Sequence, residues 1–398
     1  MKQCLSGITV IDLTHYIAGP YCTKLLAGLG AEVIKIEKPG EGDGARRLGP
    51  FPGDRPDPEQ SGLFLYLNTG KKSITLNLKT KSGVHIFKQL IADADVVVES
   101  FEPRVMPSLG LGYKVLEAIN PRLVMTSISN FGQNGPYKGY KAEEITEQAL
   151  SGLMYITGEP DREPLKSGGS LAQYIAGETA FAGTMTALLY AQATDTGQQV
   201  DVSIMEANAE MVETRLQEYF FQGTIDYRRG NFHPTTHPHK IYPCKDGWVF
   251  VTGNPLHNWP EMAKLMEEPR LADAKFATKH NRMEYRDEVD ALMEPWLMSH
   301  TKEEIYYSGQ AHGLAFGYVA TPEDLAKSKQ LRAREYFVEI EHPVAGKLRY
   351  PGGPYRMSET PFQFSPAPLL GEHNEEVYDQ RLGFSKEDIV RLRQYGVI

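Results

Sequence analysis

The stretch that decides the fold is ITVIDLTHYIAGPYCTKLLAGLGAEVIKIE, residues 8–37. It contains two apolar runs typical of buried strands, Ile8–Leu13 and Glu32–Glu37, with a short helical pattern between them at Tyr21–Leu29. Continuous runs of Val, Ile and Leu that alternate with helices are typical of a parallel sheet covered on both faces. The segment therefore predicts a doubly wound α/β fold.

The same alternation continues through the first half of the chain. Further strands are predicted at 73–78, 96–99, 123–128 and 200–204, and helices at 84–92, 115–119, 143–153, 172–192 and 205–221. The helix at 172–192 is rich in Ala and Gly, which favours close packing against a neighbouring element. We expect one large α/β domain over residues 1–225.

The sequence changes character after this point. Residues 228–243 are rich in His, Pro and Thr, and Lys245-Asp246-Gly247 is typical of a hairpin turn between two strands. Thr321 followed by Pro322 marks the start of a helix. A charged helical stretch is predicted at 259–298 and a strand at 313–319. These patterns predict a smaller α/β domain at 226–329.

Composition narrows the function classes. The 398 residues include 42 Lys plus Arg and 51 Asp plus Glu, a formal net charge of −9, and contain no basic tract. This balance argues against a nucleic-acid partner, and the lack of an apolar run of about 18 residues argues against a membrane span. The three cysteines show no CxxC spacing, and residues 1–10 lack the apolar core of a signal peptide. We therefore expect a cytoplasmic protein without disulfides.

Two common nucleotide-binding loops are missing from the sequence. The turn after the first strand, residues 14–20, has no GxGxxG pattern, and Gly70-Lys71-Lys72-Ser73 lacks the leading glycine of a P-loop. Cys244 is not favoured as a nucleophile either, because that role needs a base and an electropositive setting that the sequence does not show.

A histidine cluster is the one candidate for a metal site. His233, His237 and His239 have a spacing that can be fitted to zinc, but Pro234 and Pro238 would break any helix that aligned them. No acidic or Cys partner lies close enough in sequence to complete a usual ligand set. We therefore predict no metal.

A series of short motifs runs along nearly the whole chain. In order they are LSGITVIDLT (5–14), AGPY (18–21), LGAEVIKIE (29–37), Gly42-Asp43 with Arg46, KKSI (71–74), LGLGY (109–113), FGQ (131–133), TGQQVDVS (196–203), YPC (242–244) and LGEH (370–373). Each motif alone is weak, but their ordered occurrence resembles the class III CoA-transferases, the CaiB/BaiF family. That family includes formyl-CoA and carnitine CoA-transferases and the related 2-methylacyl-CoA racemases.

The resemblance implies the architecture and the ligands. It implies a Rossmann-like large domain that binds coenzyme A as a substrate, a small α/β domain, and an interlaced dimer in which each chain threads through the other. It also implies that the C-terminal segment, residues 330–398, returns to the large domain. The expected substrates are a CoA thioester and a carboxylic acid.

The resemblance also implies which residues contact CoA. The matching positions are His15, Ala18, Lys38, Arg46, Lys71, Lys72, Phe101 and Arg104. The cations among them would meet the CoA phosphates. Two positions depart from the family, because residues 100–104 read SFEPR where it has NFRPG, and Ser108 stands where it has Arg. Arg104 is positioned to replace the lost charge.

The departure that matters most concerns the nucleophile. Transferases of this family use an aspartate whose carboxylate attacks the acyl-CoA thioester. The resemblance places it in the string LAQYIAG, residues 171–177, where this chain has Gln173. A primary amide is a far weaker nucleophile, so the standard covalent route is blocked. The racemase branch pairs the same aspartate with an upstream histidine, and that position is Glu143 here.

Other polar residues match the family's active centre. Lys141 and Glu144 lie at such positions, so Gln173, Glu144 and Lys141 are the candidate catalytic residues. Glu178 lies more than one helical turn beyond Gln173, so we expect its carboxyl group to point elsewhere.

Four functions stay open at this point. The chain is an active CoA-transferase with altered chemistry, a non-catalytic subunit that pairs with an aspartate-bearing homologue as in the benzylsuccinate CoA-transferases, an acyl-CoA isomerase or racemase-like enzyme with Glu143 or Glu144 as base, or an acyl-CoA sensor without turnover. The sequence does not identify the acyl donor or the acceptor.

Overall fold

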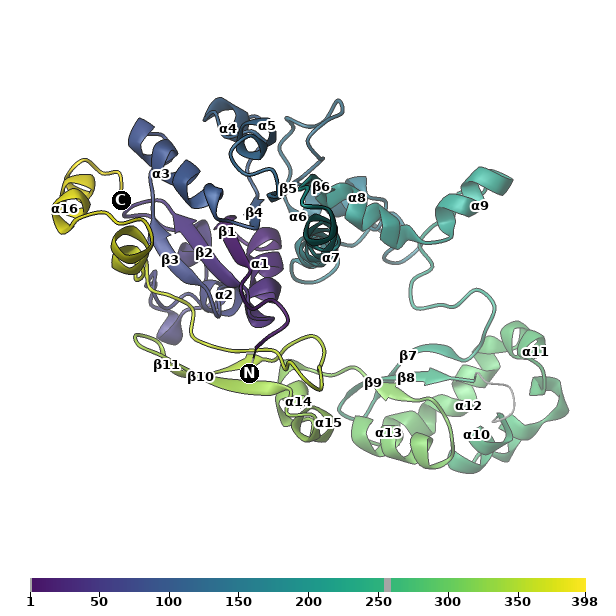
Figure 1. Ribbon diagram of the computed structural model, residues 1–398. Helices are drawn as coiled ribbons and strands as arrows, with labels where there is room; N and C mark the ends of the chain where they lie inside the picture. The colour runs from purple at the N-terminus through teal and green to yellow at the C-terminus, as the bar shows by residue number, and fades with distance from the viewer. Residues whose placement is uncertain (1, 254–258) are drawn as a thin grey trace. The chain divides into compact units, whose positions relative to one another are not determined.

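The computed structural model describes residues 2–253 and 259–398 (Figure 1). These residues form two compact units. The first contains Met1–Leu153, Lys166–Gly223 and Ala333–Ile398, and the second contains Met154–Leu165 and Thr224–Arg332.

A six-stranded parallel sheet forms the centre of the first unit. Its strands are β1 (Thr9–Leu13), β2 (Glu32–Glu37), β3 (Lys72–Thr75), β4 (Val96–Glu99), β5 (Val124–Ser129) and β6 (Gln199–Ser203). They lie in the order β3-β2-β1-β4-β5-β6. The order reverses between β1 and β4, and in open α/β sheets ligands bind outside the carboxyl ends of the strands at such a point.

Helices cover both faces of this sheet. Because side chains alternate along a strand, Val10, Val33 and Val96 pack with α1 (Ala18–Gly28) and α7 (Leu171–Thr194) in one hydrophobic cluster. On the other face, Ile11, Ile34 and Val97 pack with α3 (Lys81–Ala92) and α16 (Lys386–Gln394) in a second cluster. The predicted doubly wound α/β layout is confirmed.

Helices α1 and α7 approach each other closely. Position 177 must be glycine for the helices to come this close, since a Cβ atom there would lie 2.7 Å from the carbonyl oxygen of Ala18. The buried side of α7 is otherwise lined by alanines such as Ala176 and Ala180. Close packing places the beginning of α7 beside the beginning of α1, at the edge of the sheet where β1 ends.

Shorter helices complete the first unit. They are α2 (Gly62–Leu67), α4 (Val105–Ser108), α5 (Tyr113–Glu117), α6 (Glu144–Leu150), α8 (Ile204–Ala209) and α9 (Arg215–Gln222).

The single long helix predicted at 205–221 is wrong. The segment forms α8, a short 3-10 turn at Glu210–Val212, and then α9. Glu213 separates them with φ 59° and ψ −132°, a conformation that cannot continue a helix. None of the residues of α9 is buried, and Phe220 and Phe221 are 71% and 83% exposed.

The C-terminal segment adds a hairpin and α16 to the first unit. The hairpin is formed by β10 (Phe337–His342) and β11 (Gly346–Pro351). Beyond it, the backbone N–H of His373 donates to the carbonyl of Ser73 at 2.9 Å, and the Tyr378 hydroxyl donates to the carbonyl of Thr75 at 2.6 Å. Residues 373–378 therefore pack along the β3 edge of the sheet.

The second unit is built on a small antiparallel sheet. Strands β7 (His239–Cys244) and β8 (Gly247–Thr252) form the hairpin predicted at Lys245-Asp246-Gly247, and β9 (Gly317–Tyr318) pairs with β8. Its helices are α10 (Trp259–Leu265), α11 (Lys279–Glu284), α12 (Arg286–Ser299), α13 (Lys302–Ala311), α14 (Pro322–Lys327) and α15 (Lys329–Ala333), the last ending at the boundary with the first unit. The predicted helix start at Thr321 is confirmed, since its side chain accepts from the N–H of Asp324.

Among the described residues, no helix combines the length and the apolar character needed to cross a membrane.

Candidate functional site

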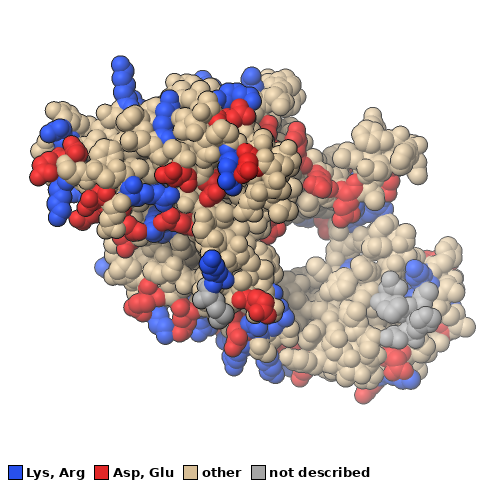
Figure 2. Space-filling model, viewed as in Figure 1, with Lys and Arg blue, Asp and Glu red and all other residues tan. Residues whose placement is uncertain are grey.

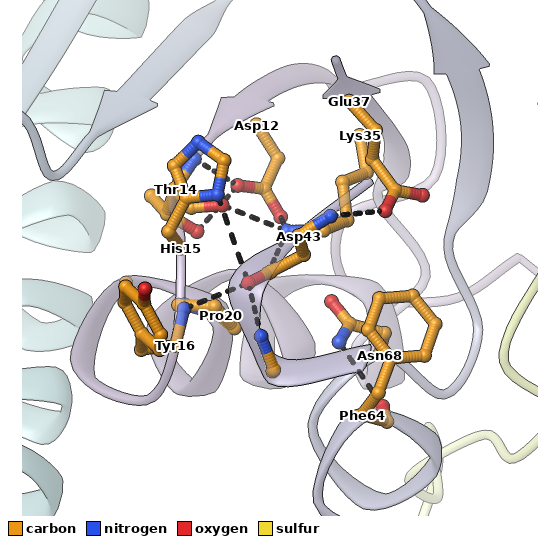
Figure 3. A network of polar contacts seen from close by, with 12 residues as sticks. Asp12, Thr14, His15, Tyr16, Pro20, Lys35, Glu37, Asp43, Phe64 and Asn68 are labelled. Carbon is orange, nitrogen blue, oxygen red and sulfur yellow. Dashed lines mark hydrogen bonds and ion pairs between the residues drawn. The ribbon is translucent and has the colours of Figure 1, made fainter. Parts of the chain in front are cut away.

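A buried network of charges lies at the carboxyl end of β1 and β2 (Figure 3). The Lys35 ammonium lies 2.9 Å from Asp43 Oδ2 and donates to the Thr14 carbonyl at 2.8 Å. The Lys71 ammonium lies 3.1 Å from Asp12 Oδ2. Burial by itself would raise the pKa of Asp12, but Lys35, Lys71 and the hydrogen bonds from Thr14 lower it to about 2. The network therefore fixes the loop that follows β1.

Two of the cations that the resemblance assigned to CoA, Lys71 and Arg46, are bonded to buried carboxylates of the protein instead. Lys71 donates to Asp12, to the Pro20 carbonyl and to Asn68 Oδ1, all within 3.1 Å. Arg46 forms two hydrogen bonds to Glu37, at 2.7 and 2.8 Å, and is fully buried. Both side chains hold the sheet edge together, so we leave them out of the proposed CoA site.

The two other lysines lie nearer the surface. Lys72 pairs with Glu32 and Glu376, both at 2.6 Å. Lys38 pairs with Glu41 at 2.5 Å, and its side chain is 53% exposed. Lys38 is therefore the lysine of the two whose ammonium group is more open to a polyanion, since Lys72 is partly buried between two carboxylates.

The carboxyl ends of β1 and β4 meet where the strand order reverses. The backbone N–H of His15 donates to Ser100 Oγ at 3.0 Å, and the ring of His15 lies 5.7 Å from that of Phe101. Ala18 begins α1 directly below them and is buried. The structure thus brings His15 and Phe101 together, with Ala18 three residues beyond His15 at the start of α1.

A pocket of about 550 Å³ lies beside this point. Its lining includes Glu99, Glu102, Arg104, Tyr113, Gln133, Lys138 and Lys141. Lys141 and Arg104 both pair with Glu102 at the rim. The Tyr113 hydroxyl and Gln133 Nε2 are buried without a hydrogen-bond partner in the described part of the chain. Buried polar atoms of this kind point to a ligand that would satisfy them.

Glu99 forms the floor of the pocket at the end of β4. Burial raises its pKa to about 7, although the Ser127 hydroxyl and the Phe101 N–H stabilise the carboxylate. The pocket therefore combines cations at the rim with a carboxyl group that is partly protonated near neutral pH.

Glu144 is the first residue of α6, and its side chain caps the beginning of α7. Its carboxylate accepts from the backbone N–H groups of Ala172 at 2.9 Å and Gln173 at 3.3 Å, and from Gln148 Nε2 at 2.6 Å. A carboxylate at a helix N-terminus satisfies free N–H groups and opposes the helix dipole favourably. Glu144 is therefore engaged with the backbone that carries Gln173.

Gln173 itself contacts a carboxylate that the sequence analysis did not single out. Its Nε2 donates to Glu147 Oε2 at 2.7 Å, and Glu147 is fully buried. Burial raises the pKa of Glu147 to about 7. The charge of Glu144 also raises this pKa, whereas the hydrogen bond from Gln173 lowers it. Helical spacing could have identified Glu147 from the sequence, because residues three apart share a helix face and Glu144 was already a candidate.

Glu178 and Glu143 lie apart from this contact. The Glu178 carboxylate accepts from the Tyr21 hydroxyl at 3.4 Å, so its predicted separation from Gln173 fits the structure. Glu143 is exposed at the N-cap of α6.

The histidine cluster has other partners. The rings of His233 and His239 lie 4.5 Å apart, and His239 Nδ1 lies 3.1 Å from Thr252 Oγ1. His237 Nε2 lies 3.0 Å from Asp290 Oδ1. No group of three His, Cys, Asp or Glu side chains is arranged to hold a metal within residues 2–253 and 259–398.

Lys24 is a buried lysine on α1 that faces the Tyr66 ring at 3.3 Å and lies near Lys71. Burial, with the charge of Lys71, lowers its pKa to about 7. The unfolded chain therefore binds more protons between about pH 7 and the ordinary lysine pKa of about 10.4, and stability rises with pH across that window.

We expect Lys24→Met to stabilise the fold by about 1–3 kcal/mol below pH 7, where the charged lysine is costly, and by progressively less toward pH 10.4. Urea unfolding of variant and wild type at pH 6 and pH 10 measures this difference. Lys114→Met is the control, since that side chain is 85% exposed. Equal stabilisation at both pH values would contradict the buried-charge explanation.

Known proteins resemble this chain along almost its whole length. The family described as CoA-transferase family III matches residues 5–374. The succinyl-CoA–D-citramalate CoA-transferase of Chloroflexus aurantiacus is 34% identical over 400 residues, covering 99% of this chain and 98% of the relative. The formyl-CoA:oxalate CoA-transferase of Streptomyces avermitilis is 36% identical over 416 residues, covering 100% of both.

A solved structure agrees with these matches. The crystal structure of a CaiB/BaiF family protein from Brucella suis has a TM-score of 0.87 and 29% sequence identity, covering 96% of this chain and 100% of that one. The chain therefore belongs to the class III CoA-transferase (CaiB/BaiF) family.

Proposed function

We propose that this protein binds CoA thioesters and moves CoA between carboxylic acids. The observation that carries this proposal is the polar pocket at the strand-order reversal, in a chain whose full-length relatives are named as CoA-transferases. Dinucleotide or P-loop chemistry has no motif in its support.

The nucleotide end of CoA fits the pocket beside β4. Arg104, Lys138 and Lys141 supply cations for phosphate groups, while the Tyr113 hydroxyl and Gln133 Nε2 would gain partners from a base or a ribose. The thioester would then extend past His15, Phe101 and Ala18 toward the beginning of α7. Lys38, which follows the carboxyl end of β2, would add surface charge at that edge. Lys72 lies at the start of β3 beside Glu32, at the opposite edge of the sheet, and does not face this route.

Gln173 supports a second candidate function. If it stands where the family has its aspartate, the chain either uses another nucleophile or serves as a non-catalytic subunit beside an aspartate-bearing homologue. An isomerase that uses Glu144 as base receives less support, because that carboxylate already accepts two backbone N–H groups.

A second chain would cover the apolar end of α9. Figure 2 shows no Lys, Arg, Asp or Glu at the tip of this helix, where Phe220 and Phe221 are largely exposed. Such a patch marks an interface, so we propose a dimer, formed either by two copies or with a homologous subunit.

The three cysteines are unpaired, which favours a reducing cytoplasm.

Acyl exchange tests the proposed function. The purified chain is incubated with succinyl-CoA or formyl-CoA and a panel of free carboxylates that includes D-citramalate and oxalate, and new CoA thioesters are followed by mass spectrometry. We expect new thioesters, and about tenfold weaker CoA binding in Arg104→Ala because one phosphate contact is lost.

Lys114→Ala is the matched control, since this cation lies on α5 outside the pocket lining and should bind CoA like the wild type. CoA binding without exchange on any carboxylate would support the subunit function instead. Absence of CoA binding would reject both.

A further inference from the structure

Three carboxylates lie around the start of α6, in different surroundings. Glu143 is exposed, and Glu144 is held by the N–H groups at the beginning of α7. Glu147 alone is fully buried, and no lysine or arginine of the described chain forms an ion pair with it. Its hydrogen bonds come from neutral groups, which leaves the negative charge of this carboxylate uncompensated.

Amide groups hold both oxygens of Glu147. Gln173 Nε2 donates to Oε2 at 2.7 Å. With the Asn130 amide in the orientation that satisfies both of its ends, its nitrogen donates to Oε1 at 3.1 Å, and its oxygen accepts from the Ala142 N–H at 3.1 Å. Gln173 is partly exposed whereas Glu147 is fully buried. Rotation of the Gln173 side chain breaks one hydrogen bond and frees Oε2.

We propose, on the basis of the proposed CoA-transferase function, that Glu147 is the carboxylate nucleophile of this protein and that Gln173 is its hydrogen-bond donor. In this proposal the carboxylate lies on α6 and faces the position on α7 where the resemblance implies an aspartate and this chain has Gln173. The substrate class is an acyl-CoA thioester with a free carboxylate as CoA acceptor.

The covalent steps balance without any further reactant. An oxygen of Glu147 attacks the thioester carbonyl carbon, the carbon–sulfur bond breaks, and CoA leaves as the thiolate. The product on the enzyme is a mixed anhydride between the acyl group and Glu147. The thiolate then attacks the glutamyl carbonyl, which releases the donor as its carboxylate and leaves a glutamyl-CoA thioester.

The second half repeats these steps in reverse order. The acceptor carboxylate attacks the glutamyl-CoA thioester, and CoA again leaves as the thiolate. The thiolate then attacks the acceptor carbonyl of the new anhydride, which breaks the carbon–oxygen bond to Glu147. Acceptor-CoA leaves, and Glu147 returns to the carboxylate. A carboxyl group whose pKa lies near neutrality suits this role, because it is ionised in part and only weakly stabilised as an anion.

Trapping identifies the nucleophile. The full chain is mixed with acetyl-CoA, succinyl-CoA or formyl-CoA without acceptor, quenched with hydroxylamine, digested, and sequenced by tandem mass spectrometry. Hydroxylamine converts an anhydride or a glutamyl thioester to a hydroxamate, and fragment ions separate Glu147 from Glu143 and Glu144. We expect the hydroxamate at Glu147, and none in heat-denatured protein.

Rates provide the second readout. Glu147→Gln preserves size and can keep one of the two amide contacts through its remaining oxygen, and we expect it to lower exchange about 10⁴-fold with an unchanged CoA dissociation constant, as for loss of a nucleophile. Glu117→Gln is the control, since Glu117 lies on α5 outside the pocket lining, and it should retain wild-type exchange. Unchanged melting temperatures in both variants would show that they fold.

The outcomes separate this inference from the function on which it rests. Suppose that the wild type exchanges CoA but the hydroxamate is found at another residue, or that Glu147→Gln exchanges CoA as fast as the wild type. Either result overturns the role of Glu147 and leaves the transferase function standing. Neither exchange nor labelling with any of the three thioesters rejects both. Labelling at Glu147 without exchange supports the nucleophile and moves the question to the acceptor.

Discussion

Adding Gln173→Asp to Glu147→Gln is expected to restore CoA transfer that Glu147→Gln alone removes. The two side chains meet at 2.7 Å, so the double variant exchanges the positions of carboxylate and amide while keeping one of each. Asp at 173 also recreates the arrangement that the family resemblance implies. We expect a recovery of about 100-fold over Glu147→Gln, less than the full loss because Asp is shorter than Gln and the site is not repacked around it.

The position of the adduct decides this prediction. Hydroxylamine trapping should now label Asp at 173 and not Gln at 147. Gln173→Asn in the Glu147→Gln background is the control, since it shortens the side chain without supplying a carboxylate and should recover nothing. Equal recovery in both double variants would mean that size, and not charge, limits the reaction.

Lys35→Met is expected to destabilise the protein by about 3–5 kcal/mol, because it leaves the buried Asp43 without its lysine and Asp12 with Lys71 alone. Lys35 is fully buried, pairs with Asp43 at 2.9 Å and lies 4.0 Å from Asp12. Methionine fills a similar volume, so the loss comes from charge and not from a cavity. Urea unfolding at pH 7 measures the change in the free energy of unfolding.

Lys38→Met is the matched control for this measurement. It removes a lysine just past the end of the same strand, but the Lys38–Glu41 pair is exposed on both sides. Exposed pairs contribute about 0–1 kcal/mol. Similar losses in the two variants would contradict the claim that burial sets the cost.

The same network predicts how acid affects the wild type. Because the pKa of Asp12 is lowered to about 2 from an unfolded value of about 3.9, its contribution is complete above the unfolded value and disappears as pH falls through about 2. Lys35→Met should reduce this acid dependence in part, since one of the two ammonium groups that lower the pKa of Asp12 is gone while Lys71 remains.

Local patterns predicted much of the fold. The β1–α1–β2 unit and the following strands were found because apolar runs and helical spacing are properties of neighbouring residues. The prediction of one long helix at 205–221 was wrong because nothing in the local sequence indicates a positive φ at Glu213, which is not a glycine. The family resemblance named His15 and Phe101 as CoA contacts, and the structure places their rings 5.7 Å apart where β1 and β4 end, since strand ends in a parallel sheet converge.

The sequence by itself determined the α/β class, the family and the amide at 173, because these follow from local periodicity and from residue identity along the chain. Only the tertiary structure decided which charges are free and which are paired. Arg46 and Lys71 look like surface cations in the sequence, yet packing buries them against Glu37 and Asp12. The contact between Gln173 and Glu147 likewise depends on how α6 packs against α7, and residues 26 positions apart carry no local signal of such a contact.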